Sequence, residues 1–142
     1  MAALKVRYGD KVYVTAPSGC AATRIGGTTL HSFAGFGRAS GKVGEIVDKV
    51  LGSRWAVKRW QKCSVLVIDE ISMLSAKLFD ALDRIGRSCR NAHEPFGGIQ
   101  LVVCGDFFQL PPVKDQLMAF QALTWNKVRL HANICRGKVL AV

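Results

Sequence analysis

With 142 residues, the chain has the length of one domain, because domains usually take roughly 100 to 200 residues. Its 20 Lys and Arg outnumber its 10 Asp and Glu, and the net charge of +10 favours a polyanionic partner, with nucleic acid the leading candidate. No stretch is long and apolar enough to span a bilayer, and the five scattered cysteines and three dispersed histidines lack the spacing of a disulfide framework or a zinc site.

The first part of the chain predicts short elements joined by glycine-containing turns. Residues 1–8 read as the end of a helix, with Gly9 where a C-terminal cap falls, and they lack the apolar stretch of a secretory signal. Val12–Ala16 is a predicted strand, and Cys20–Ile25 is a predicted short helix. Residues 28–35 form a short helical or irregular segment that leads into a glycine-rich loop.

A longer helix is predicted from Glu45 to Lys62, because apolar residues recur there close to helical spacing. Gly52 and Ser53 weaken it near its middle. The second half of this helix is basic, with Arg54, Lys58, Arg59 and Lys62. Such a run of charge is usually a solvated helix face, and contact with DNA phosphate is the alternative.

The predicted strand Ser64–Ile68 is an unbroken apolar run that ends in two adjacent carboxylates, Asp69 and Glu70. The lack of alternation predicts a strand covered on both faces, as in a parallel sheet. Carboxylates at the C-terminal edge of such a sheet suit Mg²⁺ with nucleotide phosphates, and the stretch resembles a Walker B element. In that chemistry Asp69 holds Mg²⁺ through its water shell, and Glu70 orients or deprotonates the attacking water. The alternative is an acidic N-cap, with Ser72 or Ser75 opening the next helix.

A helix is predicted from about Ser75 to Cys89, and after a loop the strand Ile99–Cys104 leads to Asp106. Two strands therefore end in an acid at the same edge, which strengthens the phosphate-site interpretation. Strands alternating with helices predict an α/β fold with a mostly parallel sheet and helices on both faces. The last predicted elements are a short helix Ala119–Trp125, a weak strand Lys127–Leu130, and a segment His131–Val142 without clear period.

Four stretches together resemble the motifs of the PIF (petite integration frequency) family of 5′-to-3′ DNA helicases, part of the first helicase superfamily. The resemblance covers nearly everything from Tyr8 to Leu130, with the motifs in the family's order. It implies a RecA-like P-loop NTPase fold. The stretches are residues 15–22 (motif Ia), 26–35 (motif Ib), 68–74 (motif II), and 105–113 with their lead-in 95–101 (motif III).

The resemblance implies Asp69 as the Mg²⁺ residue, Glu70 as the catalytic base and Gln109 as the γ-phosphate sensor. A neutral amide can donate to a phosphate oxygen while it accepts from the attacking water. The alternative for Gln109 is a helix cap or a surface amide. Asp106 and Arg136 complete the implied nucleotide-binding set, with Arg136 as the candidate for the family's arginine at the γ-phosphate.

In this family motifs Ia and Ib lie on the track of single-stranded DNA. The corresponding residues here are mostly small or polar, so they can bond phosphate oxygens and allow a close approach. For Phe33, stacking on a base and a place in the core both stay open. The implied DNA-binding residues are Pro17, Ser18, Gly19, Thr28, Thr29, His31, Ser32 and Phe33.

The sequence departs from the family because it contains no G-x-x-x-x-G-K-[ST] loop to hold the β and γ phosphates. The resemblance places that loop just upstream of residue 1 and a second motor domain further along. We therefore expect residues 1–142 to be a partial first motor domain that is incomplete at both ends and inactive alone. A missing central strand is also expected to leave a sheet edge unpaired.

The implied function is ATP-dependent 5′-to-3′ DNA unwinding, serving DNA repair, recombination and telomere or genome maintenance in the nucleus or mitochondrion. Mg²⁺ is the implied cofactor and ATP the substrate. The implied partners are single-stranded DNA, DNA forks and the remainder of the helicase chain, with no membrane. The main alternative is a non-catalytic nucleic-acid-binding remnant. A metal-dependent hydrolase that uses Asp69, Glu70 and Asp106 is a third hypothesis.

Overall fold

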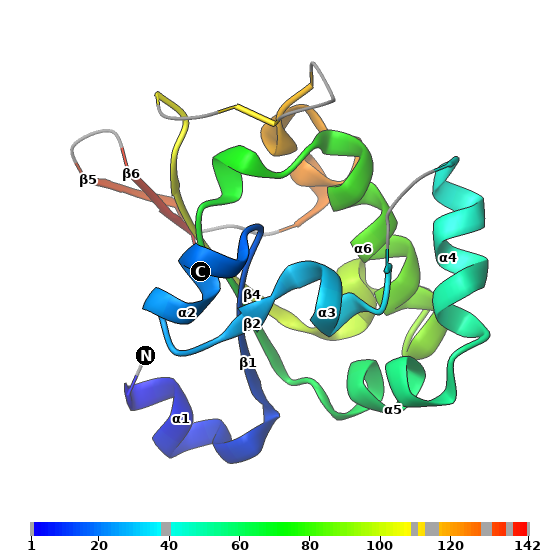
Figure 1. The fold of residues 1–142 in the computed structure, drawn as a ribbon. Helices are drawn as coiled ribbons and strands as arrows, with labels where there is room; N and C mark the ends of the chain where they lie inside the picture. Colours follow the sequence, from blue (N-terminus) through cyan, green and yellow to red (C-terminus); the bar gives the residue numbers. More distant parts are fainter. Residues whose placement is uncertain are drawn as a thin grey trace.

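The computed structural model describes residues 2–37, 41–108, 111–112, 117–128, 132–135 and 138–141, and these residues include six strands of one sheet (Figure 1). The strand order is β2-β1-β3-β4-β6-β5. The first four strands are parallel, whereas β6 is antiparallel to both β4 and β5. The predicted mostly parallel α/β sheet is therefore confirmed. The strands are β1 Val12–Ala16, β2 Thr28–Thr29, β3 Val65–Ile68, β4 Gln100–Asp106, β5 Ala132–Cys135 and β6 Lys138–Ala141.

The register of the three central strands brings their C-terminal ends together. Thr15 on β1 lies opposite Ile68 on β3, and Ile68 lies opposite Val103 on β4. The residues that follow β1 and β3 therefore leave the sheet at one edge, beside the last residues of β4. This edge is where parallel α/β sheets bind their ligands.

Helices cover both faces of the sheet, as predicted. In Figure 1, α1 and α2 lie to the left of the central strands, and α3, α4, α5 and α6 lie to the right. Ser and Thr side chains begin four of these helices, because Ser18, Thr29, Ser53 and Ser75 each accept a hydrogen bond from a backbone N–H in the first turn. The helices are α1 Ala2–Tyr8, α2 Gly19–Arg24, α3 Leu30–Ala34, α4 Val43–Leu51, α5 Arg54–Lys62 and α6 Ala76–Cys89.

The larger core lies between the sheet and helices α3 to α6. Its biggest side chains are aromatic, and Phe33 contacts the rings of both Tyr13 and Trp60. On β3 the alternate residues Leu66 and Ile68 face this core. Val65 and Val67 face a smaller cluster on the other side of the sheet, where α1 packs. All four residues of β3 are buried, as the unbroken apolar run predicts.

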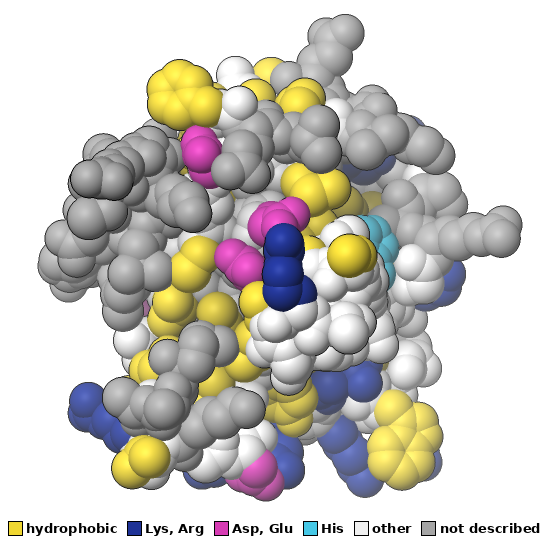
Figure 2. Space-filling model, turned by 60° about the vertical axis from the view of Figure 1, so that its left-hand side comes forward, with side chains coloured by type: hydrophobic (Ala, Val, Ile, Leu, Met, Phe, Trp, Pro, Cys, Tyr) yellow, Lys and Arg dark blue, Asp and Glu magenta, His cyan; other side chains and the backbone are white. Residues whose placement is uncertain are grey.

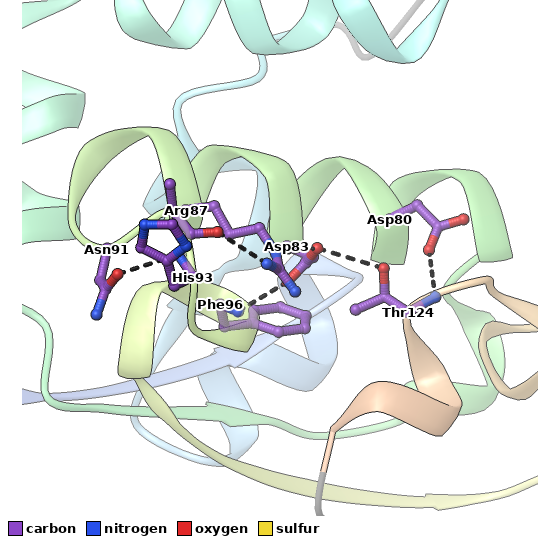
Figure 3. A network of polar contacts seen from close by, with 8 residues as sticks. Asp80, Asp83, Arg87, Asn91, His93, Phe96 and Thr124 are labelled. Carbon is purple, nitrogen blue, oxygen red and sulfur yellow. Dashed lines mark hydrogen bonds and ion pairs between the residues drawn. The ribbon is translucent and has the colours of Figure 1, made fainter.

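A buried polar network fastens two loops to α6 (Figure 3). Asp83, which is 5% exposed, accepts hydrogen bonds from Arg87 Nε at 2.8 and 3.0 Å and from the backbone N–H of Phe96 at 2.8 Å. The hydroxyl of Thr124 also donates to Asp83, at 3.4 Å. Asp80, one turn earlier, accepts the backbone N–H of Thr124 at 2.9 Å. The loop before β4 and the segment around residue 124 are therefore both held by one helix.

The structure corrects several predicted elements. The helix predicted from Glu45 to Lys62 is two helices, because α4 ends at Leu51, with Gly52 as its C-cap, and Ser53 caps α5. The helix predicted at Ala119–Trp125 is instead two 3-10 turns, at Ala119–Gln121 and Trp125–Lys127. The weak strand Lys127–Leu130 is wrong at Lys127, which ends the second turn, and its last two residues lie outside the described residues.

Both sides of β4 are paired, although an unpaired edge was expected. β3 lies along one side and β6 along the other. The hairpin of β5 and β6 falls in the segment for which the sequence shows no clear period. It forms by long-range pairing with β4, which a local sequence pattern does not report.

Candidate functional site

Asp69 and Glu70 lie where β3 leaves the sheet, beside the ends of β1 and β4. The backbone N–H of Asp69 donates to the carbonyl of Thr15 at 2.8 Å, and the Thr15 hydroxyl donates to the carbonyl of Val67 at 2.7 Å. Both bonds join β1 to β3 and fix the point where the chain turns away. Both acidic residues are partly exposed. Figure 2 shows acidic side chains meeting a basic one near the middle of this face.

Glu70 adopts a left-handed backbone conformation, with φ 51° and ψ 46°. This conformation is uncommon for a residue with a side chain, and such residues are often found at functional sites. The 3-10 helix Ile71–Met73 follows, and Glu70 makes no side-chain capping bond to it. Ser75 caps the next long helix instead. Of the N-cap alternative, the opening of the next helix by Ser75 is therefore confirmed, whereas the Glu70 carboxylate does not cap the turn that follows it.

Gly105 on β4 supports this turn by close contact. A Cβ atom at Gly105 would lie 2.8 Å from Ile71 Cγ2 and 2.9 Å from the backbone nitrogen of Ile71. Only glycine lets β4 approach the turn so closely. Sequence reasoning did not single out Gly105, although a glycine inside an apolar strand pattern is a known signal of close backbone approach.

Arg24 is a second residue of the site that sequence reasoning missed. It is the last residue of α2, and its guanidinium Nη2 donates to Oε1 of Glu70 at 2.5 Å. The two residues are 46 positions apart in the chain. No local pattern predicts such a pair, because it depends on how α2 and the end of β3 are placed by the fold.

The fit of Asp69 to Mg²⁺ rests on its own oxygens. Its carboxylate is a hard donor at the open edge of the sheet, which suits a Mg²⁺ ion that keeps most of its water and binds a single protein carboxylate beside phosphates. Burial raises the pKa of the nearby Cys104 thiol, and the charge of Asp69 raises it further. Among the described residues, no three His, Cys, Asp or Glu side chains are grouped to hold a metal by themselves.

The remaining implied nucleotide residues are only partly described. Gln109 and Arg136 lie outside the described residues. Asp106 ends β4, and its Oδ1 accepts the backbone N–H of Phe108 at 3.0 Å. Phe107 packs against the ring of Phe120, with centroids 4.9 Å apart. The structure therefore brings Asp106 to the same edge as Asp69 and Glu70.

The implied DNA residues of motifs Ia and Ib lie next to each other in space. β2 pairs with the end of β1, and Thr28 and Thr29 lie opposite Thr15 and Ala16. Ser18 and Thr29 use their side chains as helix caps, accepting from Ala21 and Ser32. The implied residues that are at least partly exposed are Pro17, Ser18, Gly19, Thr28, Thr29, His31 and Ser32.

His31 and Phe33 differ from the other implied DNA residues. His31 is partly buried against Phe36, and this burial lowers its pKa. Phe33 is only 1% exposed, between Tyr13 and Trp60. Two roles were left open for Phe33, and the structure places its ring in the hydrophobic core. The expected stacking of Phe33 on a base is therefore corrected. Its ring cannot meet a base without opening the core.

The basic residues of α5 divide into two that bind other segments of the chain and two that stay on its exposed surface, where the Lys58 ammonium lies 5.8 Å from the centre of the Trp55 ring. Arg59 donates to the backbone carbonyls of Phe33 at 2.6 Å and Ser32 at 2.9 Å, so it fastens α3 to α5. Lys62 pairs with Asp10. Arg54 and Lys58 stay exposed on either side of Trp55, which is 80% exposed. No helix among the described residues is long and apolar enough to cross a membrane.

Comparison with known proteins gives a consistent family match. The family model for PIF1-like helicases matches residues 1–134. The chain is 50% identical over 130 residues to the ATP-dependent DNA helicase PIF1 of Saccharomyces cerevisiae, covering 87% of this chain and 15% of that protein. The chain therefore spans less than a fifth of the length of this relative.

Two crystal structures show the same fold. The Pif1 helicase of Candida albicans matches with a TM-score of 0.85 and 47% identity, over 89% of this chain and 29% of that one. A Bacteroides Pif1 helicase in complex with ADP-AlF3 and single-stranded DNA matches with a TM-score of 0.65 and 34% identity, over 82% of this chain and 30% of that one. The fold of the described residues is therefore that of a RecA-like helicase motor domain.

Proposed function

The chain belongs to the PIF1-like helicase family, and on this premise we propose that it is part of the first motor domain of an ATP-dependent 5′-to-3′ DNA helicase. The chain spans 15% of the Saccharomyces cerevisiae relative, so ATP hydrolysis, DNA unwinding and the DNA partners are proposed for a longer protein that contains these 142 residues. The phosphate-holding loop that the sequence lacks is assigned to that remainder. The proposed roles are DNA repair, recombination and telomere or genome maintenance in the nucleus or mitochondrion.

The observation that carries the proposal is the shared edge of β1, β3 and β4. The register of these strands sets the acids after β3 beside the residues that follow β1. A nucleotide site and a DNA track at neighbouring strand ends can be coupled over a short distance. The Bacteroides relative, whose structure holds both ADP-AlF3 and single-stranded DNA, supports this combination of ligands.

In the proposed mechanism, Asp69 would hold Mg²⁺ through its water shell, and the ion would supply positive charge against the phosphate groups. Glu70 accepts a hydrogen bond from the attacking water and takes its proton. Gln109 is proposed as the γ-phosphate sensor, with Asp106 and Arg136 in the same nucleotide-binding set. Each of these roles is a proposal for the complete protein.

The proposed DNA track runs along the exposed polar residues of motifs Ia and Ib. Ser18, Gly19 and Thr28 offer hydroxyl and backbone groups that can bond phosphate oxygens without reading the base sequence. Single-stranded DNA and the single-stranded arm of a fork are therefore the proposed DNA partners. Phe33 is left out of this track because it is buried.

The proposal is tested by Glu70→Gln in the natural protein that carries this chain. The substitution keeps the size of the side chain and removes its ability to take a proton. The DNA-stimulated ATPase rate should fall by roughly 10²- to 10⁴-fold. The matched control is Glu94→Gln, because Glu94 is exposed and makes no capping bond through its side chain. An ATPase rate that stays at the wild-type value in Glu70→Gln refutes the catalytic role.

A second candidate is a non-catalytic nucleic-acid-binding protein of the same family. The net charge of +10, together with the lack of a G-x-x-x-x-G-K-[ST] loop in these residues, favours it. It predicts that the natural protein binds single-stranded DNA with a strong salt dependence and has no ATPase activity. The intact mass of the natural protein separates the candidates, because a mass near 15.5 kDa leaves no room for the missing loop.

A further inference from the structure

The ion pair between Arg24 and Glu70 joins the proposed DNA track to the proposed catalytic carboxylate. Arg24 lies at the end of α2, and Ser18, in the proposed track, caps the start of the same helix. The guanidinium Nη2 of Arg24 lies 2.5 Å from Oε1 of Glu70. Because α2 has only six residues and a helix rises about 1.5 Å per residue, the Ser18 cap and Arg24 lie roughly 9 Å apart along its axis.

The ion pair between Arg24 and Glu70 is accessible to solvent and to other ligands. The side chain of Arg24 is 68% exposed and that of Glu70 is 31% exposed. Exposed ion pairs are weak, and one such contact shifts an equilibrium by only about two- to five-fold. A phosphate group, in contrast, can accept two parallel hydrogen bonds from one guanidinium, which is a stronger arrangement. A DNA phosphate can therefore compete for Arg24.

The contact also holds the side chain that catalysis needs. A general base accepts the proton of the attacking water with a carboxylate oxygen, and the bond from Arg24 to Oε1 holds one of the two oxygens of Glu70 and so fixes the direction of its carboxylate. The backbone of Glu70 is meanwhile fixed by its left-handed turn and by the contact of Gly105 with Ile71. The side chain is therefore the part of Glu70 that can change its partner.

We propose that Arg24 is a positioning residue that holds Glu70 in a resting arrangement until a DNA phosphate takes its guanidinium. The released carboxylate then orients the attacking water, so DNA binding raises the rate of ATP hydrolysis. This inference rests on the proposed function of Glu70. It adds a direct link, through one side chain, between the DNA track and the catalytic base.

The test compares ATPase rates of the natural protein without DNA and with saturating single-stranded oligonucleotide. Arg24→Gln should raise the DNA-free rate about two- to five-fold and leave the DNA-stimulated rate unchanged, so the stimulation ratio falls by the same factor. Arg24→Gln should also remove about one phosphate contact from the bound oligonucleotide. The slope of log K against log salt should therefore become less steep by about 0.7. Arg84→Gln is the control, because Arg84 is an exposed arginine on α6.

Two results overturn the inference. One is a DNA-free rate in Arg24→Gln equal to or below that of the wild type. The other is a stimulation ratio in Arg24→Gln equal to that of Arg84→Gln. Glu70→Gln, measured alongside, separates the two levels of the proposal. If Glu70→Gln is inactive and Arg24→Gln behaves as wild type, only the role of Arg24 fails. If Glu70→Gln keeps its activity, the proposed function itself fails.

Discussion

Replacing Asp83 with Ala should destabilise the protein strongly, because this buried carboxylate joins three parts of the fold. It accepts hydrogen bonds from Arg87 on its own helix, from the backbone N–H of Phe96 and from the hydroxyl of Thr124. Phe96 is fully buried. Its N–H would therefore lose its partner in a place that water reaches poorly.

The magnitude follows from the surroundings of each partner. An unpaired buried N–H costs about 1 to 3 kcal/mol. The side chain of Arg87 is 27% exposed, so it can be rehydrated and its loss adds only about 1 kcal/mol. The bond from Thr124 is long, at 3.4 Å, and adds little. The free energy of unfolding should fall by about 3 kcal/mol in total.

Urea denaturation followed by circular dichroism measures this change. Asp48→Ala is the matched control, because Asp48 is exposed on α4 and the same substitution gives both helices the same gain in helix propensity. Asp83→Ala should therefore be about 3 kcal/mol less stable than Asp48→Ala. A difference below about 1 kcal/mol would show that the network of Figure 3 contributes little to stability.

Two other substitutions test the close packing of Gly86 and the burial of His31. Gly86→Ala would place a methyl group 2.6 Å from the backbone oxygen of Phe96, so it should lower the free energy of unfolding by about 1 to 3 kcal/mol, whereas Gly44→Ala, where nothing lies within 4 Å, should not. Equal urea midpoints for these two variants would contradict the close contact. Burial lowers the pKa of His31, so the unfolded chain binds more protons and stability should be lost as pH falls below about 6.5. The urea midpoint should therefore fall more between pH 7.5 and pH 5.5 in the wild type than in His31→Gln. An equal fall in both proteins would rule out this contribution of His31 to stability.

The elements that the sequence predicts well are those with a strong local signal. The strand Val12–Ala16 and the burial of β3 follow from runs of β-branched and leucine residues. The helix predicted from about Ser75 begins after Ser75 because that side chain caps it. β2 is missed because two residues are too few to carry a period, and it forms only where β1 offers a partner.

For the candidate site, the sequence indicates Asp69 and Glu70 but not Arg24, which pairs with Glu70, or the close approach of Gly105. Asp69 and Glu70 follow directly from an apolar run that ends in charge. Arg24 depends on contact between segments that are far apart in the chain, so no periodicity reports it. Phe33 shows the converse limit, since an aromatic residue between small ones fits both a core and a stacking site until its burial is known.

The contact between Gly105 and Ile71 restricts which residue can stand at position 105. A Cβ atom there would lie 2.8 Å from Ile71 Cγ2 and 2.9 Å from the backbone nitrogen of Ile71. Ile71 is fully buried, so it cannot move aside without disturbing the core. Because Ile71 directly follows Glu70, a larger residue at position 105 would also displace the turn that carries Glu70. The packing of one glycine in β4 and the placement of the Glu70 carboxylate therefore depend on each other.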